Sequence, residues 1–440
     1  MIRRATKPSS RRRPTGPQRV RKIHSFEALE RREVLDAALQ VVHNSPYEAA
    51  AEVDVYVNDA LLLDDFAYGT ATPFVTVPSG VNLKIDITAP DAADNSSPVF
   101  TTNAVLAADT NYVAIAAGDP LGVGPAFTIA VSDLGRQTAA NPANAEFFVF
   151  HGAPDAPAVD VQARGVGTLV DDIAFPNFAP DYLSVPPDSY TIDVTLANGT
   201  TRVRSFEADL SGAAGAALMV AATGLVAPAP GQPEFGLLAV FADGTTALLP
   251  EVAPEVVGTN RSDRFTAQMS DGVLEISGGG QTTEFLALTN PLVSIRGRRG
   301  NDRLSVYLSE TETLPAIAFN GGRGYDSLYV HGTSGDDDIT IVETNDYASL
   351  VPGTLAVKRV EAATVWAGAG DDHVDASGIM SFGITIFGGR GNDVLRGGDA
   401  HDVIFGGLGN DVLIGGPGFD LLIDFFGRNE RDDRPWWWFF

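Results

Sequence analysis

Cysteine is absent from the 440 residues, which excludes disulfide bonds, thiolate metal sites and cysteine nucleophiles. No run of about 18 consecutive apolar residues occurs, so the sequence predicts no membrane-spanning helix. Positive charge is scarce outside the N-terminus. Residues 1–33 hold 11 Lys or Arg and 3 acidic residues, which leaves 19 basic and 53 acidic residues, a net charge of −34, for the rest of the chain. A body this acidic repels nucleic acid and anionic lipid and suits cations.

Glycine and proline are frequent, with 46 and 27 residues, so we expect many turns and few long helices. Their distribution is uneven. Residues 1–250 contain 21 Pro and 17 Gly, whereas residues 251–440 contain 6 Pro and 29 Gly. This change from proline-controlled loops to glycine-controlled turns predicts a domain boundary near residue 250.

The N-terminal arm, residues 1–37, is basic and contains a short motif. Residues 26–37 read Phe-Glu-Ala-Leu-Glu-Arg-Arg-Glu-Val-Leu-Asp-Ala. This stretch resembles a sorting motif near the N-terminus of large bacterial surface proteins, although Arg31 replaces its proline and Glu33 interrupts its apolar run. The alternative is an amphipathic helix at the end of a disordered arm. No apolar segment follows the basic residues, as a Sec signal peptide would require.

A repeat of about 107 residues follows the arm, in the manner of tandem domains. Strands such as residues 83–88 alternate apolar and polar positions, which predicts one face on a core and one in water. We therefore predict two β-sandwich copies, residues 38–136 and 145–250. The matching segments are 41–46 with 149–154, 53–55 with 159–161, and 85–88 with 192–195. Their His-x-x-Pro signature is similar to a bacterial family of unknown function found in exported proteins. That resemblance implies a fold and a location but no activity.

Four nine-residue units fill residues 388–423 without insertion or deletion, and they follow the pattern G-G-x-G-x-D-x-U-x, where U is aliphatic. The pattern resembles the RTX calcium-binding nonapeptide repeat, which implies Ca²⁺ as the cofactor. Asp at position six supplies the anionic oxygen that calcium prefers, and glycine lets backbone carbonyls approach closely. The candidate calcium-binding residues are Asp393, Asp402, Asp411 and Asp420, with the loop glycines Gly388, Gly391, Gly397, Gly406, Gly409, Gly415 and Gly418.

One unit makes half a turn of a parallel β-roll, so the period pairs Asp393 with Asp411 and Asp402 with Asp420. Strands stack about 4.8 Å apart, where two carboxylates repel by about 3.5 kcal/mol at an effective dielectric of about 20. A calcium ion between the two carboxylates replaces this repulsion with a net attraction. We therefore expect the roll, residues 388–424, to fold only with calcium. Ala400 replaces a glycine in the second unit and His401 precedes Asp402, so we expect the Asp402–Asp420 site to be weaker.

Degenerate copies of the glycine–aspartate pattern lie upstream at irregular spacing. We interpret residues 251–387 as an irregular β-solenoid that grades into the roll. The weaker calcium candidates are Asp302, Asp326, Asp337 and Asp372. The alternative is that these Gly-Asp pairs form ordinary turns without an ion.

No common catalytic motif occurs: His-Glu-x-x-His, Gly-x-Ser-x-Gly and the Walker phosphate loop are all missing. Polar residues that recur in both sandwich copies could act as a base or hold a metal, or could simply satisfy backbone groups and cap turns. These are His43 and His151, Asp54 and Asp160, and the pairs Asp64-Asp65 and Asp171-Asp172. We expect no enzyme.

Residues 425–440 end in Trp436-Trp437-Trp438-Phe439-Phe440, an apolar patch of the kind that marks an interaction. The RTX resemblance implies a role in export for this tail; the alternative is a cap on the open end of the solenoid.

The sequence as a whole predicts an all-β protein: two tandem β-sandwich domains, an irregular β-solenoid and a parallel β-roll. We expect a secreted or cell-surface bacterial protein with a structural or adhesive role. Its candidate partners are calcium and a surface glycan or another envelope protein, with no nucleic acid and no membrane span. The alternative function is a secreted enzyme, for example one that acts on polysaccharide, with the roll as its secretion and stability module.

Overall fold

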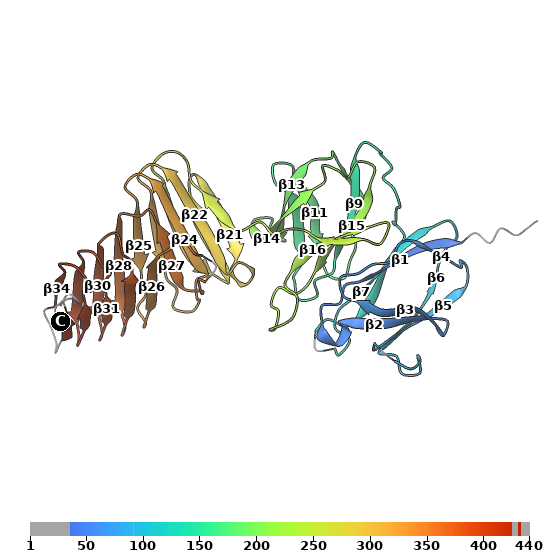
Figure 1. Ribbon diagram of the computed structural model, residues 1–440, viewed down its shortest axis with the longest axis horizontal. Helices are drawn as coiled ribbons and strands as arrows, with labels where there is room; N and C mark the ends of the chain where they lie inside the picture. The colour runs from blue at the N-terminus through green and yellow to red at the C-terminus, as the bar shows by residue number, and fades with distance from the viewer. Residues whose placement is uncertain (1–35, 91, 123, 348, 425–429, 433–440) are drawn as a thin grey trace, which may run out of the picture.

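The computed structural model describes residues 36–90, 92–122, 124–347, 349–424 and 430–432. Residues 26–35 of the arm motif and the aromatic residues 436–440 of the tail lie outside these ranges. The described chain is all-β, as predicted, with two single-turn 3₁₀ helices, η1 (Glu48–Ala50) and η2 (Ala287–Thr289). Within it, no helix is long and apolar enough to cross a bilayer. The sandwiches lie at one end of an elongated molecule and the solenoid at the other (Figure 1).

The first sandwich packs a sheet of order β4-β1-β7-β8 against one of order β3-β2-β5-β6. Strands β1 and β7 are parallel, and the other neighbours are antiparallel. The strands are β1 (Ala37–His43), β2 (Glu52–Val57), β3 (Ala60–Ala67), β4 (Val75–Val77), β5 (Asn82–Thr88), β6 (Phe100–Val105), β7 (Asn111–Ala117) and β8 (Thr128–Ser132).

The second sandwich repeats this order as β12-β9-β15-β16-β17 over β11-β10-β13-β14. His43 ends β1 and His151 ends β9, while Asp86 lies on β5 and Asp193 on β13, so the repeated residues occupy equivalent strands. The strands are β9 (Ala145–His151), β10 (Val159–Ala163), β11 (Gly167–Ile173), β12 (Leu183–Val185), β13 (Ser189–Leu196), β14 (Thr201–Asp209), β15 (Ala217–Thr223), β16 (Gly236–Phe241) and β17 (Thr246–Leu248).

The two sandwiches share an apolar interface. Outward-facing residues of β9, β15 and β16 form one buried cluster with residues of β1 and β7. All seven residues of β9 are buried, because one face meets its own core and the other meets the first sandwich. In a strand covered on both faces, apolar residues follow one another instead of alternating with polar residues. Gln40 adds a hydrogen bond across the interface to the carbonyl of Phe241 at 2.7 Å.

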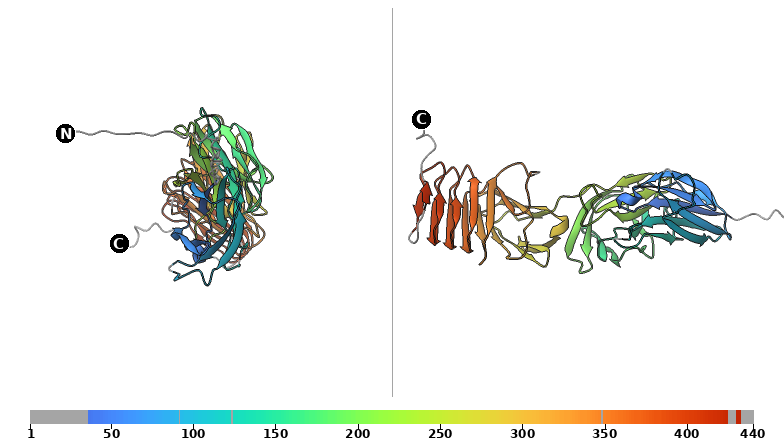
Figure 2. Two further views of the ribbon diagram at one scale, coloured as in Figure 1. Left: turned by 90° about the vertical axis from the view of Figure 1, so that its right-hand side faces the viewer. Right: turned by 90° about the horizontal axis from the view of Figure 1, so that it is seen from below.

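The solenoid consists of two facing sheets whose strands are mostly parallel and stack rung upon rung (Figure 2). One sheet runs β18-β22-β24-β27-β26-β29-β31-β33-β35, and the other runs β21-β20-β19-β23-β25-β28-β30-β32-β34. The strands are β18 (Glu255–Val257), β19 (Arg264–Ser270), β20 (Val273–Gly278), β21 (Gln281–Leu286), β22 (Leu292–Arg299), β23 (Arg303–Tyr307), β24 (Ala316–Arg323), β25 (Ser327–His331), β26 (Asp338–Glu343), β27 (Thr354–Lys358), β28 (Ala362–Ala369), β29 (His373–Gly378), β30 (Ile384–Arg390), β31 (Val394–Arg396), β32 (Val403–Leu408), β33 (Val412–Ile414), β34 (Leu421–Ile423) and β35 (Glu430–Asp432).

Aliphatic side chains fill the space between these sheets in one continuous core. The position-eight residues of the first three nonapeptides, Leu395, Ile404 and Leu413, are fully buried there, and Leu422 of the fourth packs against them. Strand β31 pairs in parallel with β33, and β32 with β34. Units n and n+2 therefore stack, which is the arrangement that a half-turn repeat requires.

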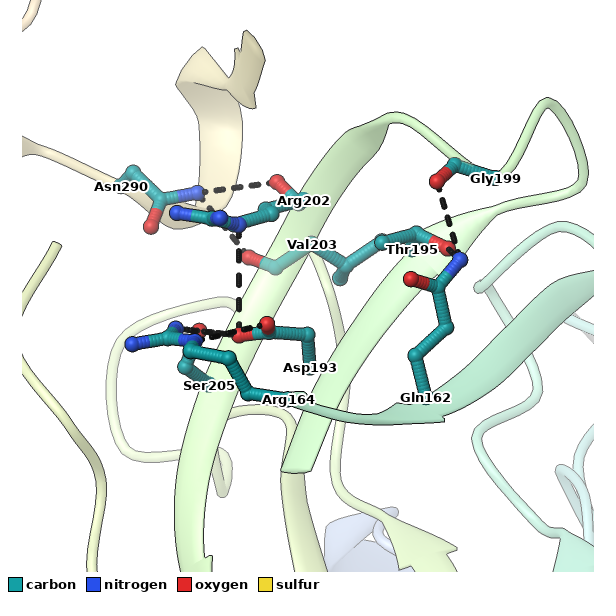
Figure 3. Close-up of polar contacts among 9 residues, drawn as sticks. All are labelled: Gln162, Arg164, Asp193, Thr195, Gly199, Arg202, Val203, Ser205 and Asn290. Atoms are coloured by element: carbon teal, nitrogen blue, oxygen red, sulfur yellow. Dashed lines mark hydrogen bonds and ion pairs between the residues drawn. The ribbon is translucent and has the colours of Figure 1, made fainter. Parts of the chain in front are cut away.

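The second sandwich and the solenoid are joined through one sheet. Strand β14 pairs in parallel with β21, with Thr201 opposite Glu284. The side-chain amide of Asn290 donates to the carbonyl of Val203 at 2.9 Å, on the strand that also carries Arg202 and Ser205 beside Asp193 (Figure 3). The sandwich thus covers the first rung of the solenoid, which would otherwise be an open end.

Candidate metal centre

Each nonapeptide places its Asp immediately before a short strand, so the carboxylates form rows along the solenoid edges. On one edge the backbone N–H of Asp393 donates to Oδ1 of Asp411 at 2.9 Å. On the other, the N–H of Asp402 donates to Oδ1 of Asp420 at 2.9 Å. One oxygen of each acceptor carboxylate thereby ties successive turns together, and the second oxygen is directed into the loop.

The first glycine of each unit marks where oxygens converge. A Cβ atom on Gly388 would lie 2.4 Å from Oδ2 of Asp393 and 2.6 Å from the carbonyl oxygen of Gly406 in the next turn. The same atom on Gly397 would lie 2.3 Å from Oδ2 of Asp402 and 2.6 Å from the carbonyl oxygen of Gly415. Each glycine therefore leaves room at a point that a carboxylate and a backbone carbonyl both face.

Several of these second oxygens are buried without a hydrogen-bond donor. Within the described residues, Oδ2 of Asp302, Asp326, Asp372 and Asp393 has no hydrogen-bond partner. Burial raises the pKa of Asp302, Asp372 and Asp393 to about 6, against the attraction of the backbone N–H that each accepts. An unpartnered buried carboxylate is costly, and a divalent cation in the adjacent cradle would offset that cost. Carboxylate and carbonyl oxygens are also the hard donors that calcium prefers, so the residues fit this ion.

The upstream candidates join the same rows. The N–H of Asp302 donates to Oδ1 of Asp326, and the N–H of Asp372 donates to Oδ1 of Asp393. Gly297 and Gly321 face Oδ2 of Asp302 and Asp326 as closely as Gly388 faces Asp393. The structure therefore brings Asp372 directly into the row of the regular repeats.

Asp337 differs from these residues. Its Oδ2 accepts hydrogen bonds from the backbone N–H of Thr333 at 2.6 Å and from the Thr333 hydroxyl at 3.1 Å. This arrangement is the ordinary turn that was the alternative for the degenerate copies. Asp337 is thus the weakest of the four upstream candidates for a metal ligand.

The loop around Asp402, in the unit that contains Ala400 and His401, has a different hydrogen-bond pattern from the loop around Asp393. Oδ2 of Asp402 accepts the N–H of Gly398 at 2.8 Å, so both of its oxygens already have donors. His401 accepts the N–H of Phe419 through Nδ1 at 2.9 Å. Burial still raises the pKa of Asp402 to about 6.

Sequence patterns missed one acidic residue of this site, Asp424. A Cβ atom on Gly406 would lie 2.6 Å from Oδ2 of Asp411 and 2.9 Å from Oδ2 of Asp424. Burial raises the pKa of Asp411, and the charge of Asp424 adds to that effect. Asp424 follows the last repeat strand and lies outside the nonapeptide consensus; the one available signal was an acidic residue directly after an aliphatic strand.

The recurring aspartates of the sandwiches accept backbone hydrogen bonds from the neighbouring strand. Oδ1 of Asp54 accepts the N–H of Asp65 at 3.0 Å, and Oδ1 of Asp160 accepts the N–H of Asp172 at 2.8 Å. Asp65 and Asp172 have φ of 48° and 50°, so each aspartate fixes a bulge in the neighbouring strand. Asp54, Asp64 and Asp65 do bring carboxylate oxygens within 4.8 Å of one another, but two of the three are exposed.

The recurring histidines meet backbone groups instead of these aspartates. Nε2 of His151 lies 2.9 Å from the carbonyl oxygen of Pro157, and Nδ1 of His43 accepts the N–H of Ser45. Burial lowers the pKa of both imidazoles, that of His43 to about 4. Both rings are therefore neutral at physiological pH.

Asp193 shows how a buried acid of the second sandwich is compensated. Its carboxylate accepts two hydrogen bonds from Arg164 and one from Ser205, and Arg202 lies 3.9 Å away (Figure 3). Burial opposes ionisation, yet these donors hold the pKa below its usual value. Both carboxylate oxygens of Asp193 thus have donors, unlike Oδ2 of Asp302, Asp326, Asp372 and Asp393 among the described residues of the solenoid.

Comparison with known families agrees with this division of the chain. Residues 37–162 and 145–248 match a domain of unknown function, DUF4397, and residues 385–422 match the RTX calcium-binding nonapeptide repeat in four copies. No curated protein matches the chain significantly. The chain therefore carries two matches to DUF4397 across residues 37–248 and, nearer its C-terminus, a match to the RTX calcium-binding repeat across residues 385–422.

Proposed function

We propose that this is a secreted or cell-surface structural protein whose C-terminal solenoid is ordered by calcium. The observation that carries the proposal is the row of buried carboxylates, exemplified by Asp393, whose second oxygen meets a backbone carbonyl of the next turn at a glycine. Calcium concentrations are high outside the cell, and extracellular modules bind it at about 10⁻⁴–10⁻³ M. A module with such an affinity is ordered after export and not before it.

The sandwiches are the adhesive part of this proposal. The sheet of the second sandwich continues into the solenoid through β14 and β21, so a stiffened solenoid would hold the sandwich pair at a fixed distance from its own far end. The partner class is a surface glycan or another envelope protein. The acidic character of the chain outside the arm favours partners that are neutral or basic.

Part of the proposal is that the protein works without catalysis. The polar residues that recur in both sandwiches, such as Asp54 and Asp160, accept backbone hydrogen bonds that shape strands. The buried histidines are equivalent in both copies and bond backbone groups. Assays of the purified chain against polysaccharide and ester substrates, with calcium, should detect no turnover; turnover that a His151→Ala variant abolishes would contradict this.

Calcium titration of the full chain tests the metal part of the proposal. We expect saturable binding by calorimetry at millimolar calcium or below, with magnesium a poor substitute because it retains its water. Asp393→Asn should weaken this binding. Asp399→Asn makes the same change at an exposed position in the same repeats and should leave it unchanged. Equal binding by both variants would contradict the proposed site.

Glycan-array and envelope-binding measurements on the full chain, with and without calcium, test the adhesive part. We expect a partner that requires the sandwiches and is retained better with calcium. Localisation of the native protein to the cell interior would contradict the extracellular role while leaving calcium binding intact.

A further inference from the structure

The second sandwich encloses a cavity between its two sheets. The cavity has a volume of about 240 Å³, and it reaches core residues that are themselves buried, among them Val161, Ile192 and Leu218. Native interiors normally contain few voids larger than a water molecule. A smaller apolar cavity, of about 150 Å³, stays dry and binds benzene. The space in this sandwich is therefore large enough for an apolar ligand and poor at holding water.

Small residues create this space. Ala163 on β10 and Ala239 on β16 line the cavity from opposite sheets, at inward positions where larger residues would fill the core. Facing sheets lie about 10 Å apart, so missing side chains on both sides leave a slot about one side chain thick. A slot of this shape suits an unbranched alkyl chain better than a broad ring system.

The cavity opens to solvent at a rim of exposed apolar residues. Val166, in the turn between β10 and β11, is 64% exposed, and Leu248 on β17 is 67% exposed, yet both line the cavity. Exposed apolar residues continuous with an apolar interior give a ligand tail a path from water to the core.

Acidic residues set the charge of this opening. Of the described residues that line the cavity, only Glu207, Asp209 and Tyr190 are ionisable. Tyr190 donates its hydroxyl hydrogen to the carbonyl of Pro186, and Oδ1 of Asp209 accepts the N–H of Ser211. Two exposed carboxylates repel an anionic head group and attract a cationic one.

We propose that the second sandwich binds a single alkyl chain of an amphiphile whose head group is uncharged or cationic. The chain occupies the slot between Ala163 and Ala239, and the head group lies near Glu207 and Asp209. This site is independent of the calcium-binding loops, which lie on the solenoid.

Calorimetry on the full-length protein with 1-decanol, decylamine and decanoate tests the proposal. We expect decanol and decylamine to bind with a negative heat-capacity change, the mark of apolar burial, and decanoate to bind at least tenfold more weakly. Binding of none of the three would overturn the site. Equal binding of decanoate, unchanged by the double substitution Glu207→Gln and Asp209→Asn, would overturn the head-group preference.

Two filling variants locate the ligand. Ala239→Leu and Ala163→Leu should each weaken decanol binding at least tenfold while the melting temperature stays the same or rises, because the new side chain occupies an existing void. Leu121→Ala, at an exposed position in the first sandwich, is the control and should bind normally. Unchanged decanol binding in either folded filling variant would overturn the proposed position. If both filling variants misfold, the Glu207→Gln, Asp209→Asn protein decides: restored decanoate binding supports the site, and no restoration contradicts it.

Discussion

At the scale of single residues, the two sides of the roll are not equivalent. Oδ2 of Asp393 lacks a donor among the described residues, whereas Oδ2 of Asp402 accepts the N–H of Gly398. An ion would compensate the second oxygen of the first carboxylate, whereas a backbone N–H already compensates that of the second. The Asp393–Asp411 side should therefore carry most of the calcium-dependent stability.

Asp411→Ala should remove a ligand from that side. We expect it to lower calcium-dependent stabilisation by about 2–3 kcal/mol, the loss of one site at about 100 times its dissociation constant, and to cause a smaller loss in chelator, where the N–H of Asp393 loses its acceptor. Asp402→Ala should destabilise the protein with and without calcium, because it also removes acceptors for the N–H groups of Ile384 and Gly398. Thermal unfolding of both variants in calcium and in chelator separates these patterns; identical profiles would contradict the asymmetry.

The raised carboxylate pKa values predict an unusual pH dependence. Asp302, Asp372, Asp393 and Asp402 have folded-state pKa values of about 6, above the ordinary value near 3.9. Proton binding therefore stabilises the folded solenoid fully below about pH 4, and this contribution is lost as the pH rises through about 6. Calcium requires the deprotonated form, so its affinity should rise over the same interval.

In chelator, the solenoid should consequently melt at a higher temperature at about pH 4.5 than at about pH 7.5, and saturating calcium should reverse that order. All four tryptophans lie at or beyond residue 366, so tryptophan fluorescence reports on the C-terminal part alone. A melting temperature in chelator that rises with pH over this range would contradict the conclusion that these buried carboxylates have raised pKa values.

The sequence alone predicted that Asp393 stacks with Asp411 and Asp402 with Asp420, because a strict nine-residue period fixes which residues stack. It could not predict the difference between Asp337 and Asp372, since both follow a Gly-x-Asp pattern and only the tertiary structure supplies Thr333 as a partner for Asp337. Asp424 was missed for a related reason: it reaches the loop through the fold of the last turn and not through the repeat.

At the scale of elements, the glycine loops are as important as the acids. The φ angle of Gly388 lies outside the left-handed region, so the reason for glycine there is space: a Cβ atom would lie 2.4 Å from Oδ2 of Asp393. Gly335, in another solenoid loop, also has an ordinary φ, and a Cβ atom there would meet no atom nearer than 3.8 Å.

Gly388→Ala should therefore abolish calcium binding on its side of the roll, because the methyl group occupies the point where the oxygens converge. We expect at least a tenfold loss of affinity. Gly335→Ala is the matched control and should bind calcium normally. Calorimetric titration of the two variants makes the comparison, and normal binding by Gly388→Ala would show that the ion lies elsewhere.

Two features of the elements were not predicted from the sequence. Strand β9 is buried on both faces, because the first sandwich covers its outer face, and the sequence did not predict this contact between the sandwiches. The outer face of one solenoid sheet also carries a ladder of stacked rings, with centroids 4.5–6.1 Å apart, formed by Tyr307, His331, Trp366, Phe387 and Phe405. Irregular spacing of 18 to 35 residues hides this ladder in the sequence, and only the strand register reveals it.

At the scale of the whole molecule, the chain divides by what stabilises each part. The sandwiches have apolar cores, and acids such as Asp193 have protein donors for their oxygens. The solenoid has an apolar core too, but in the part of the chain that the structure describes, its edges carry carboxylates with one buried oxygen that lacks a donor, as in Asp372 and Asp393. The sandwiches should therefore be equally stable with and without calcium, whereas the far end of the solenoid should be much less stable without it.

Hydrogen–deuterium exchange of the full chain, in chelator and in saturating calcium, tests this division most directly because it reports on every part of one molecule. We predict that calcium slows exchange in peptides from residues 388–424, with a smaller effect around residues 297–326 and 372. Peptides from residues 38–250 should exchange equally in both conditions. Unchanged exchange across residues 388–424, or calcium-dependent protection of the sandwiches instead, would contradict the account.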